Sequence, residues 1–364
     1  MYLRLTSKRE IPKPNSFQRI SWVILFTLLS FSLTAQLSIC KKQDSIRTVY
    51  LDSLQYYYSK NNERKVLATF DQLIELLPTA TEYLLRKGVY LNRLEQYQQS
   101  YYEFNKAIEV NPRLLEAYFW RGLSLLNLKS YDSAIKDFSL VIEKTNRLDS
   151  MAYKYRGMAY FEKEDFIKAT IDFDSALFYN KRDFEILIRL AQSHFNSKRN
   201  DTALKIIDNL LETDPYHPDA IIIKVNICFE QNCLNEALNE CKKYLLKYPE
   251  DESINLLTGA ILVEKKEYAA SLPNLTKSIR LNNKESFFLY GVANYYLAND
   301  QVAIEALQKT LSFNPSQNEE MEIHFMIGVC KNNIQTGSGC ADIKKAISMG
   351  LHDASSTYNE DCKK

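Results

Sequence analysis

The side chains best suited to covalent chemistry in this chain are its seven cysteines, at positions 40, 228, 233, 241, 330, 340 and 362. Thiols can pair as disulfides, carry a lipid, bind a metal or act as nucleophiles. In a protein outside the cytoplasm, an odd number of cysteines leaves one of them unpaired or modified. A lipid on Cys40 would leave six cysteines, which is an even number.

Neither metal binding nor catalysis is indicated by the spacing of the reactive residues. Positions 228, 233 and 241 are five and eight residues apart, which does not match the two-residue spacing of paired zinc ligands. The histidines at 194, 217, 324 and 352 are scattered, and neither an HExxH motif nor a glycine-rich phosphate loop is present. No pair of carboxylates stands out as acid and base. We therefore predict no metal, no cofactor and no enzymatic activity.

The last two cysteines suggest a covalent link near the end of the chain. Cys340 and Cys362 flank one predicted helix and its return, so we predict a disulfide between them, with Cys330 as a rival partner for either. The alternative is that all of these residues are buried thiols that pack as small hydrophobes. We favour that alternative for Cys228 and Cys241 in core positions. Residue 233 lies at a turn, where a reactive thiol is one interpretation, and we favour a simple exposed thiol.

The N-terminal segment has the features of an export signal. Residues 20–40 carry no charge, and five basic residues precede them. Cleavage near Ala35 by an ordinary signal peptidase is one interpretation. The segment Leu37-Ser38-Ile39-Cys40 resembles a bacterial lipobox, apart from the residue before the cysteine, so lipidation of Cys40 is supported equally.

An uncleaved anchor is a third interpretation of the N-terminal segment, since its apolar stretch is just long enough to span a bilayer. All three interpretations place residues 43–364 outside the cytoplasm, in the periplasm or cell envelope. Membrane contact is then expected only through the N-terminal segment or its lipid.

The composition predicts helices joined by short turns. Glycine and proline each occur 9 times in 364 residues, together about 5%, where average usage gives about 12%. This scarcity argues against sandwiches and barrels, which need frequent turns. The 46 basic and 45 acidic residues nearly balance, so nothing points to nucleic acid as a partner.

Small residues recur along the chain with a period of about 34 residues. Six glycines mark this step, and Ala191 and Val225 fill the two missing places; the glycines are Gly88, Gly122, Gly157, Gly259, Gly291 and Gly328. A second small residue follows twelve positions later, and a larger apolar residue four positions after that. The pattern predicts a pair of amphipathic helices in each step, as at 115–128 and 131–143.

The chemistry of these positions explains the period. Gly122 and Ala134 are small where the two predicted helices cross, so the backbones can approach closely, and Phe138 fills the space beside them. Each pair alone leaves an apolar face uncovered and must stack on a neighbour.

Segments 117–138 and 152–173 carry residues that resemble the tetratricopeptide repeat family. The family's large–Gly–Tyr–Ala–Phe–Ala pattern falls on Tyr153, Gly157, Tyr160, Ala169, Phe173 and Ala176. The resemblance implies an all-α, right-handed solenoid of about eight repeats over 47–317, with a degenerate first repeat. Residues 1–40 would be the signal or membrane segment and 41–46 a linker. Residues 318–364 would be a degenerate repeat and a cysteine-containing cap, similar to exported Bacteroidetes repeat proteins.

The resemblance also implies a groove on the first helices that binds a protein or peptide. The residues predicted to line it are Phe119, Leu126, Lys154, Phe161, Ile188, Phe195, Ile222, Phe229, Phe288 and Tyr295. The alternative, equally supported, is that these side chains pack between repeats. We expect a non-catalytic scaffold for protein interaction. The alternatives are an envelope-anchored lipoprotein with a structural or assembly role and, less supported, an enzyme with an unrecognised site.

Overall fold

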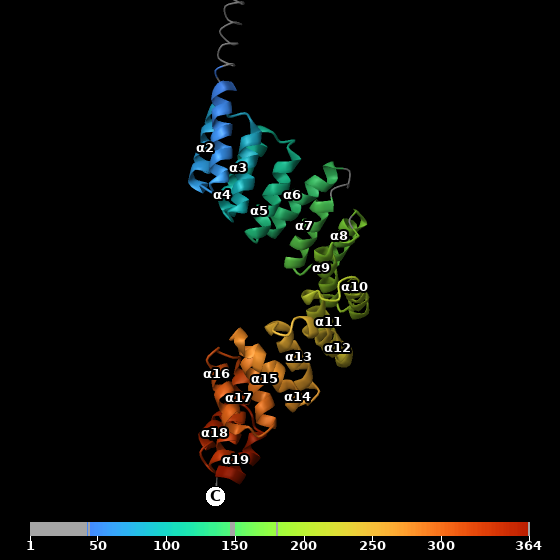
Figure 1. Ribbon diagram of the computed structural model, residues 1–364, viewed down its shortest axis with the longest axis vertical. Helices are drawn as coiled ribbons and strands as arrows, with labels where there is room; N and C mark the ends of the chain where they lie inside the picture. The colour runs from blue at the N-terminus through green and yellow to red at the C-terminus, as the bar shows by residue number, and fades with distance from the viewer. Residues whose placement is uncertain (1–41, 43, 146–149, 180, 363–364) are drawn as a thin grey trace, which may run out of the picture. The chain divides into compact units, whose positions relative to one another are not determined.

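The computed structural model describes residues 42, 44–145, 150–179 and 181–362, and within these ranges the only regular elements are helices (Figure 1). The predicted all-α fold is therefore confirmed. The export segment and Cys40 lie outside the described residues. Among the described residues, no helix has the length and apolar character needed to cross a membrane. The chain divides into two compact units, Met1–Ala152 and Tyr153–Lys364, which we describe separately.

The first unit is built from consecutive antiparallel helices. A helix over 44–59 is followed by α2 (Glu63–Leu76), α3 (Thr81–Arg93), α4 (Tyr97–Val110), α5 (Leu115–Asn127) and α6 (Tyr131–Lys144). Each helix from α2 to α5 contacts the next one along the chain, and the first helices α3 and α5 also contact each other. This is the stacking of helix pairs that the 34-residue period predicts.

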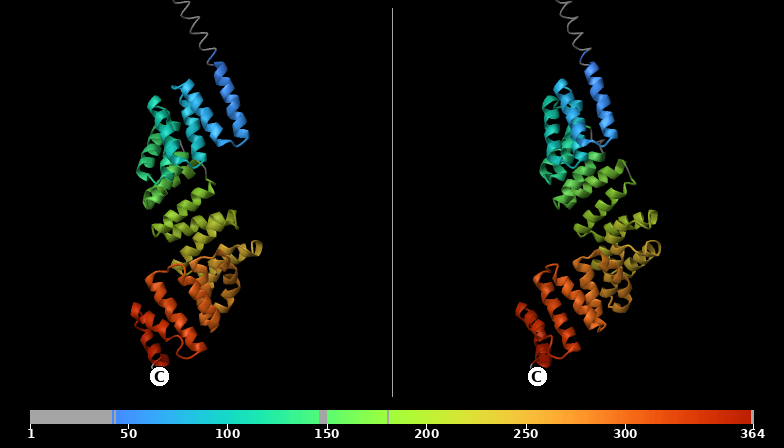
Figure 2. Two further views of the ribbon diagram at one scale, coloured as in Figure 1. Left: turned by 90° about the vertical axis from the view of Figure 1, so that its left-hand side faces the viewer. Right: turned by 60° about the vertical axis from the view of Figure 1, so that its left-hand side comes forward.

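The second unit begins within α7, at Tyr153, and is also built from consecutive helix pairs (Figure 2). Its first helices α9, α11, α13 and α15 contact one another in order, as in an α-solenoid. The helices are α7 (Ser150–Glu162), α8 (Phe166–Tyr179), α9 (Phe184–Asn196), α10 (Asn200–Thr213), α11 (Pro218–Gln231), α12 (Leu234–Lys247), α13 (Glu252–Glu264), α14 (Tyr268–Ser278), α15 (Lys284–Tyr296), α16 (Asp300–Leu311), α17 (Gln317–Ile334), α18 (Cys340–Met349) and α19 (Ala354–Cys362).

The two helices of a pair cross so closely that the crossing point has no room for a side chain. A Cβ atom added to Gly122 would lie 2.8 Å from Cε1 of Phe138, a ring that is completely buried. Gly88 faces Phe104 in the same way, one step earlier. Where Val225 takes the place of glycine, α11 and α12 contact each other less extensively. The crossing is looser where the small residue is missing.

In the pairs from the helix over 44–59 to α16, the turn depends on one residue in the left-handed conformation, and none of these residues is glycine. The φ angles are 59° at Glu95, 58° at Lys129 and 60° at Lys266. This conformation lets the next amide reach back into the helix, as in the bond of 2.9 Å from the Gln96 N–H to the Leu91 carbonyl. The backbone therefore repeats the same reversal at the same step.

Partly buried ion pairs hold the helices of several pairs together, and the repeat pattern does not predict them. Arg121 donates to both carboxylate oxygens of Asp137, at 2.7 and 2.6 Å. Arg156 and Asp172 stand at the same positions one step later, and their side chains are joined in the same way. Burial raises the pKa of Asp172, and its hydrogen bond to Arg156 opposes that effect. The carboxylate is stable inside the stack only because the guanidinium accompanies it.

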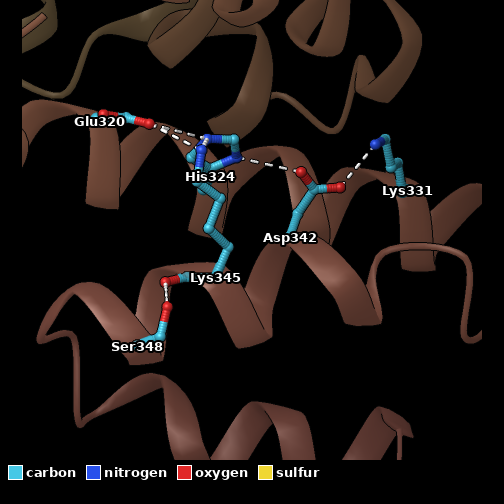
Figure 3. Close-up of polar contacts among 6 residues, drawn as sticks. All are labelled: Glu320, His324, Lys331, Asp342, Lys345 and Ser348. Atoms are coloured by element: carbon cyan, nitrogen blue, oxygen red, sulfur yellow. Dashed lines mark hydrogen bonds and ion pairs between the residues drawn. The ribbon is translucent and has the colours of Figure 1, made fainter.

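Polar contacts and a disulfide close the C-terminal end. His324 on α17 lies between Glu320, Asp342 and Lys345, and its Nδ1 is 3.2 Å from the Asp342 carboxylate (Figure 3). Lys331 contacts the other oxygen of Asp342 at 2.6 Å. These contacts join α17 to α18 where no further repeat pair follows among the described residues.

The cysteine pairing agrees with one expectation and differs from another. A disulfide joins Cys340 to Cys362, and Cys330, the rival partner, is a buried free thiol. A loop closure of this size contributes about 2–4 kcal/mol. The expectation of free thiols at Cys228 and Cys233 is wrong, because the structure joins them in a second disulfide. The reversal after α11 is the reason, since the N–H of residue 233 bonds the carbonyl of residue 228 at 3.1 Å.

We predict that Ala169→Asp unfolds the helix pair α7–α8. Ala169 is completely buried, so the change places an unpaired charge inside the stack and is expected to cost about 3–5 kcal/mol. Thermal melting followed by far-ultraviolet circular dichroism measures the effect. Ala269→Asp is the matched control because this alanine is exposed on α14. Equal melting temperatures for the two variants would contradict the close-crossing model.

Candidate partner-binding surfaces

The first unit has a hollow between its first helices. It has a volume of about 270 Å³. Leu54 and Tyr58 from the helix over 44–59, several residues of α3, and Trp120 from α5 surround it. Leu54 is 6% exposed, so the floor is apolar and well packed. Arg86 and Arg93 of α3 bring positive charge to the same hollow, and Glu116 is its one acidic lining residue.

The second unit has a more polar hollow, of about 420 Å³, between α9 and α11. Its lining comes from two neighbouring first helices and the turn before the second, through Glu185, Ile188, Arg189, Gln192, His217 and Asp219. Arg189 donates to the side-chain oxygen of Gln192 at 3.2 Å and lies over the ring of Phe161 at 5.4 Å. Charged and amide groups here are suited to hydrogen bonding with an extended peptide.

Two residues of the predicted groove, Phe119 and Leu126, lie in the first unit. The ring of Phe119 packs against Phe138 of its own helix pair, with centroids 5.9 Å apart. Leu126 is half-buried, and neither residue lines the hollow of this unit. The structure therefore does not bring these two residues together with the hollow.

Most predicted groove residues of the second unit contact neighbouring repeats. Phe161 packs against the core around α8, and Phe195 and Ile222 pack against the next core. Phe288 and Tyr295 pack against the core that α16 and α17 share.

Two further residues of this unit differ from that group. Ile188 is both a core residue and part of the polar hollow, whereas Phe229 is 40% exposed. The predicted stripe is thus largely a packing surface.

Lys154 is part of an internal ion pair. It is 6% exposed, its ammonium lies 3.3 Å from the Asp183 carboxylate, and it also bonds Glu185. Although burial lowers the pKa of Lys154, the hydrogen bond to Glu185 raises it, and the net direction is upward. The charged group links α7 to α9, and both of its acidic partners belong to the chain itself.

The rotation of the first helix determines which of its residues line the hollows, and these differ from most residues of the predicted groove. Positions four after the repeat glycine face the next first helix, as Asn92 shows by accepting from Ser124 at 3.0 Å. Positions two before and one after the glycine, such as Arg86 and Val89, line the hollow instead. Arg189 and Gln192 occupy the equivalent places around Ala191. Helical spacing puts these positions on one face, and this periodicity was the signal that could have found them.

The remaining free thiols are poor candidates for reaction. Burial raises the pKa of both Cys241 and Cys330 to about 12, so neither is a thiolate at neutral pH. Among the described residues, no group of three or more His, Cys, Asp or Glu side chains is placed to hold a metal ion.

The comparison with known families agrees with this architecture. Residues 85–149 match the model of the tetratricopeptide repeat. The C-terminal part of a repeat-containing protein of this type from Cytophaga hutchinsonii superimposes with a TM-score of 0.54. It is 16% identical and covers 64% of this chain and 96% of its own. The chain has the fold of tetratricopeptide-repeat proteins.

Other solved repeat structures are similar over different shares of the chain. A tetratricopeptide repeat protein from Parabacteroides merdae has a TM-score of 0.41 and 12% identity, covering 78% of this chain and 98% of its own. YrrB, described as a TPR protein with an unusual peptide-binding site, has a TM-score of 0.45 and 19% identity. It covers 54% of this chain and 97% of its own. No curated protein matches the sequence.

We predict that two phenylalanines of the predicted groove contribute unequally to the free energy of unfolding. Phe195→Ala should lower the free energy of unfolding by roughly 1–3 kcal/mol, because the ring packs on the core but is not fully buried. Phe229→Ala should cost less, about 1 kcal/mol or below, since Phe229 is 40% exposed. Urea denaturation of the two variants tests this. A larger loss for Phe229→Ala would show that the packing assignment is incorrect.

Proposed function

We propose that this protein is a non-catalytic scaffold that binds a segment of another protein on its first helices. The supporting observation is that each unit has a hollow on this surface, lined by side chains from neighbouring first helices. Tetratricopeptide-repeat folds serve protein interaction through the same helices, and the lining offers both apolar contacts and hydrogen-bonding groups. Function outside the cytoplasm is part of the proposal. It is supported by the export-like N-terminal sequence and by two disulfides.

Site-specific photocrosslinking tests the binding surface. A photoreactive phenylalanine analogue placed at Gln192 lies in the hollow of the second unit, and one at Leu246 lies on α12, where the native side chain is 88% exposed. We expect crosslinked adducts in native cells from position 192 and few or none from position 246. Adducts from position 246 alone would contradict binding on the first helices.

Anchoring of this scaffold by a lipid on Cys40 is a second proposal. The other six cysteines are accounted for by two disulfides and two buried thiols, which leaves Cys40 as the one without an assigned state. Its surrounding sequence resembles a lipobox, apart from Ile39.

We predict that metabolic labelling with a fatty acid marks the wild-type protein, and that Cys40→Ser removes the label. Cys241→Ser is the matched control, because this cysteine is buried and unpaired. Equal labelling of wild type and Cys40→Ser would exclude lipidation at this position.

A further inference from the structure

The hollow of the first unit has the dimensions of a pocket for one bulky side chain. Its volume of about 270 Å³ is below the about 300–1,000 Å³ typical of sites that enclose a whole drug-sized ligand. Phe70 and Leu85, which are 1% and 8% exposed, contribute to a rigid apolar floor. Trp120 supplies an aromatic wall from α5. An aliphatic or aromatic side chain of a peptide would bury its apolar surface here.

The edge of the hollow presents hydrogen-bond donors that the protein itself does not use. Tyr90 is 9% exposed, yet its hydroxyl has no hydrogen-bond partner among the described residues. Its ring lies 5.0 Å from that of Tyr58, whose hydroxyl is also without such a partner. Burial raises the pKa of both hydroxyls, so they remain protonated donors, and the positive charge of Arg93 acts in the opposite direction on both. Arg93 and the two tyrosines line the same hollow.

Two arginines, Arg86 and Arg93, and one glutamate, Glu116, line this pocket, so its lining carries a net positive charge. Arg93 forms no ion pair with any residue that the structure describes, in contrast to Lys87 on the same helix, which contacts Asp71 and Glu103. Arg86 pairs only with Glu82 on its own helix, and both side chains are more than half exposed, at 57% and 58%. Exposed pairs of this kind contribute little and exchange readily. Both guanidiniums can thus turn toward a carboxylate, which they bind with two parallel hydrogen bonds.

We propose that this hollow binds a peptide segment in which a carboxylate adjoins a bulky apolar side chain. The apolar side chain enters between Leu85, Val89 and Trp120. The carboxylate accepts hydrogen bonds from Arg93 and the hydroxyls of Tyr58 and Tyr90. This inference rests on the proposed scaffold function and specifies the chemistry of one of its binding sites.

Trp120 provides a direct readout, since the other tryptophan of the chain is Trp22. The experiment uses the full chain in mild detergent with Trp22→Phe, so that all tryptophan emission comes from the hollow. The probes are three fluorescein-labelled glycine–serine octapeptides, each with one phenylalanine. The first has glutamate beside the phenylalanine and an amidated end, the second has glutamine in its place, and the third ends in phenylalanine with a free carboxylate.

We expect at least one carboxylate peptide to change Trp120 emission and to bind about tenfold more tightly than the glutamine peptide, as measured by fluorescence anisotropy. Arg93→Gln should remove this difference, and Tyr90→Phe should reduce it. Arg113→Gln is the matched control, because Arg113 is exposed in the same unit and does not line the hollow. The first and third peptides distinguish a side-chain carboxylate from a terminal one.

Equal binding of all three peptides, no binding by any of them, or unchanged selectivity in Arg93→Gln would overturn the proposal. Circular dichroism of each variant shows whether the helices remain folded. The Arg113→Gln control shows whether lost affinity comes only from a lower net charge. If these peptide results are negative while position 192 still forms crosslinked adducts, the scaffold proposal stands and only this pocket assignment fails.

Discussion

The close crossing of two helices within each repeat is the constraint on which the rest of the structure depends. At Gly122 and Phe138 the two backbones approach so closely that a single methyl group would overlap the ring. This geometry requires a very small residue on the first helix and a large one on the second, and it recurs about every 34 residues. A helix pair of this kind cannot bury its apolar surface alone, so its stability depends on its neighbours. The recurrence of small and large residues about every 34 positions follows from that contact, whereas α11 and α12, with Val225 in the glycine place, keep the left-handed turn and the stacking without it.

The same constraint assigns different roles to the faces of each first helix. One face is used by the crossing, and a second is used by contacts with the next first helix, as at Asn92 and Phe195. The remaining face, with Arg86 and Arg189, lines the hollows. The buried Lys154 and the partly buried Arg121 are paired with carboxylates of the chain, and these pairs keep the helices in register. The side chains that packing leaves available are therefore those that line the hollows.

Covalent chemistry in this chain supports the architecture. The Cys228–Cys233 bond spans the reversal between α11 and α12, and the Cys340–Cys362 bond joins the last two described helices. The network around His324 adds polar contacts at the same end (Figure 3). Terminal units of a stacked protein lack a neighbour on one side, and cross-links there oppose fraying.

The fold class, the repeat period and the helix pairs can be predicted from the sequence, because the spacing of small and large apolar residues is a local property of the chain. The predicted bounds 115–128 and 131–143 differ from those of α5 and α6 by at most one residue. Which faces of the first helices are free depends instead on packing in three dimensions. The rotation of each first helix depends on contacts between residues some 30 positions apart, such as Asn92 with Ser124. The turn between α11 and α12 brings Cys233 beside Cys228. For that reason the predicted groove fell mainly on packing residues, whereas Arg93, Trp120 and Gln192 were found only in three dimensions.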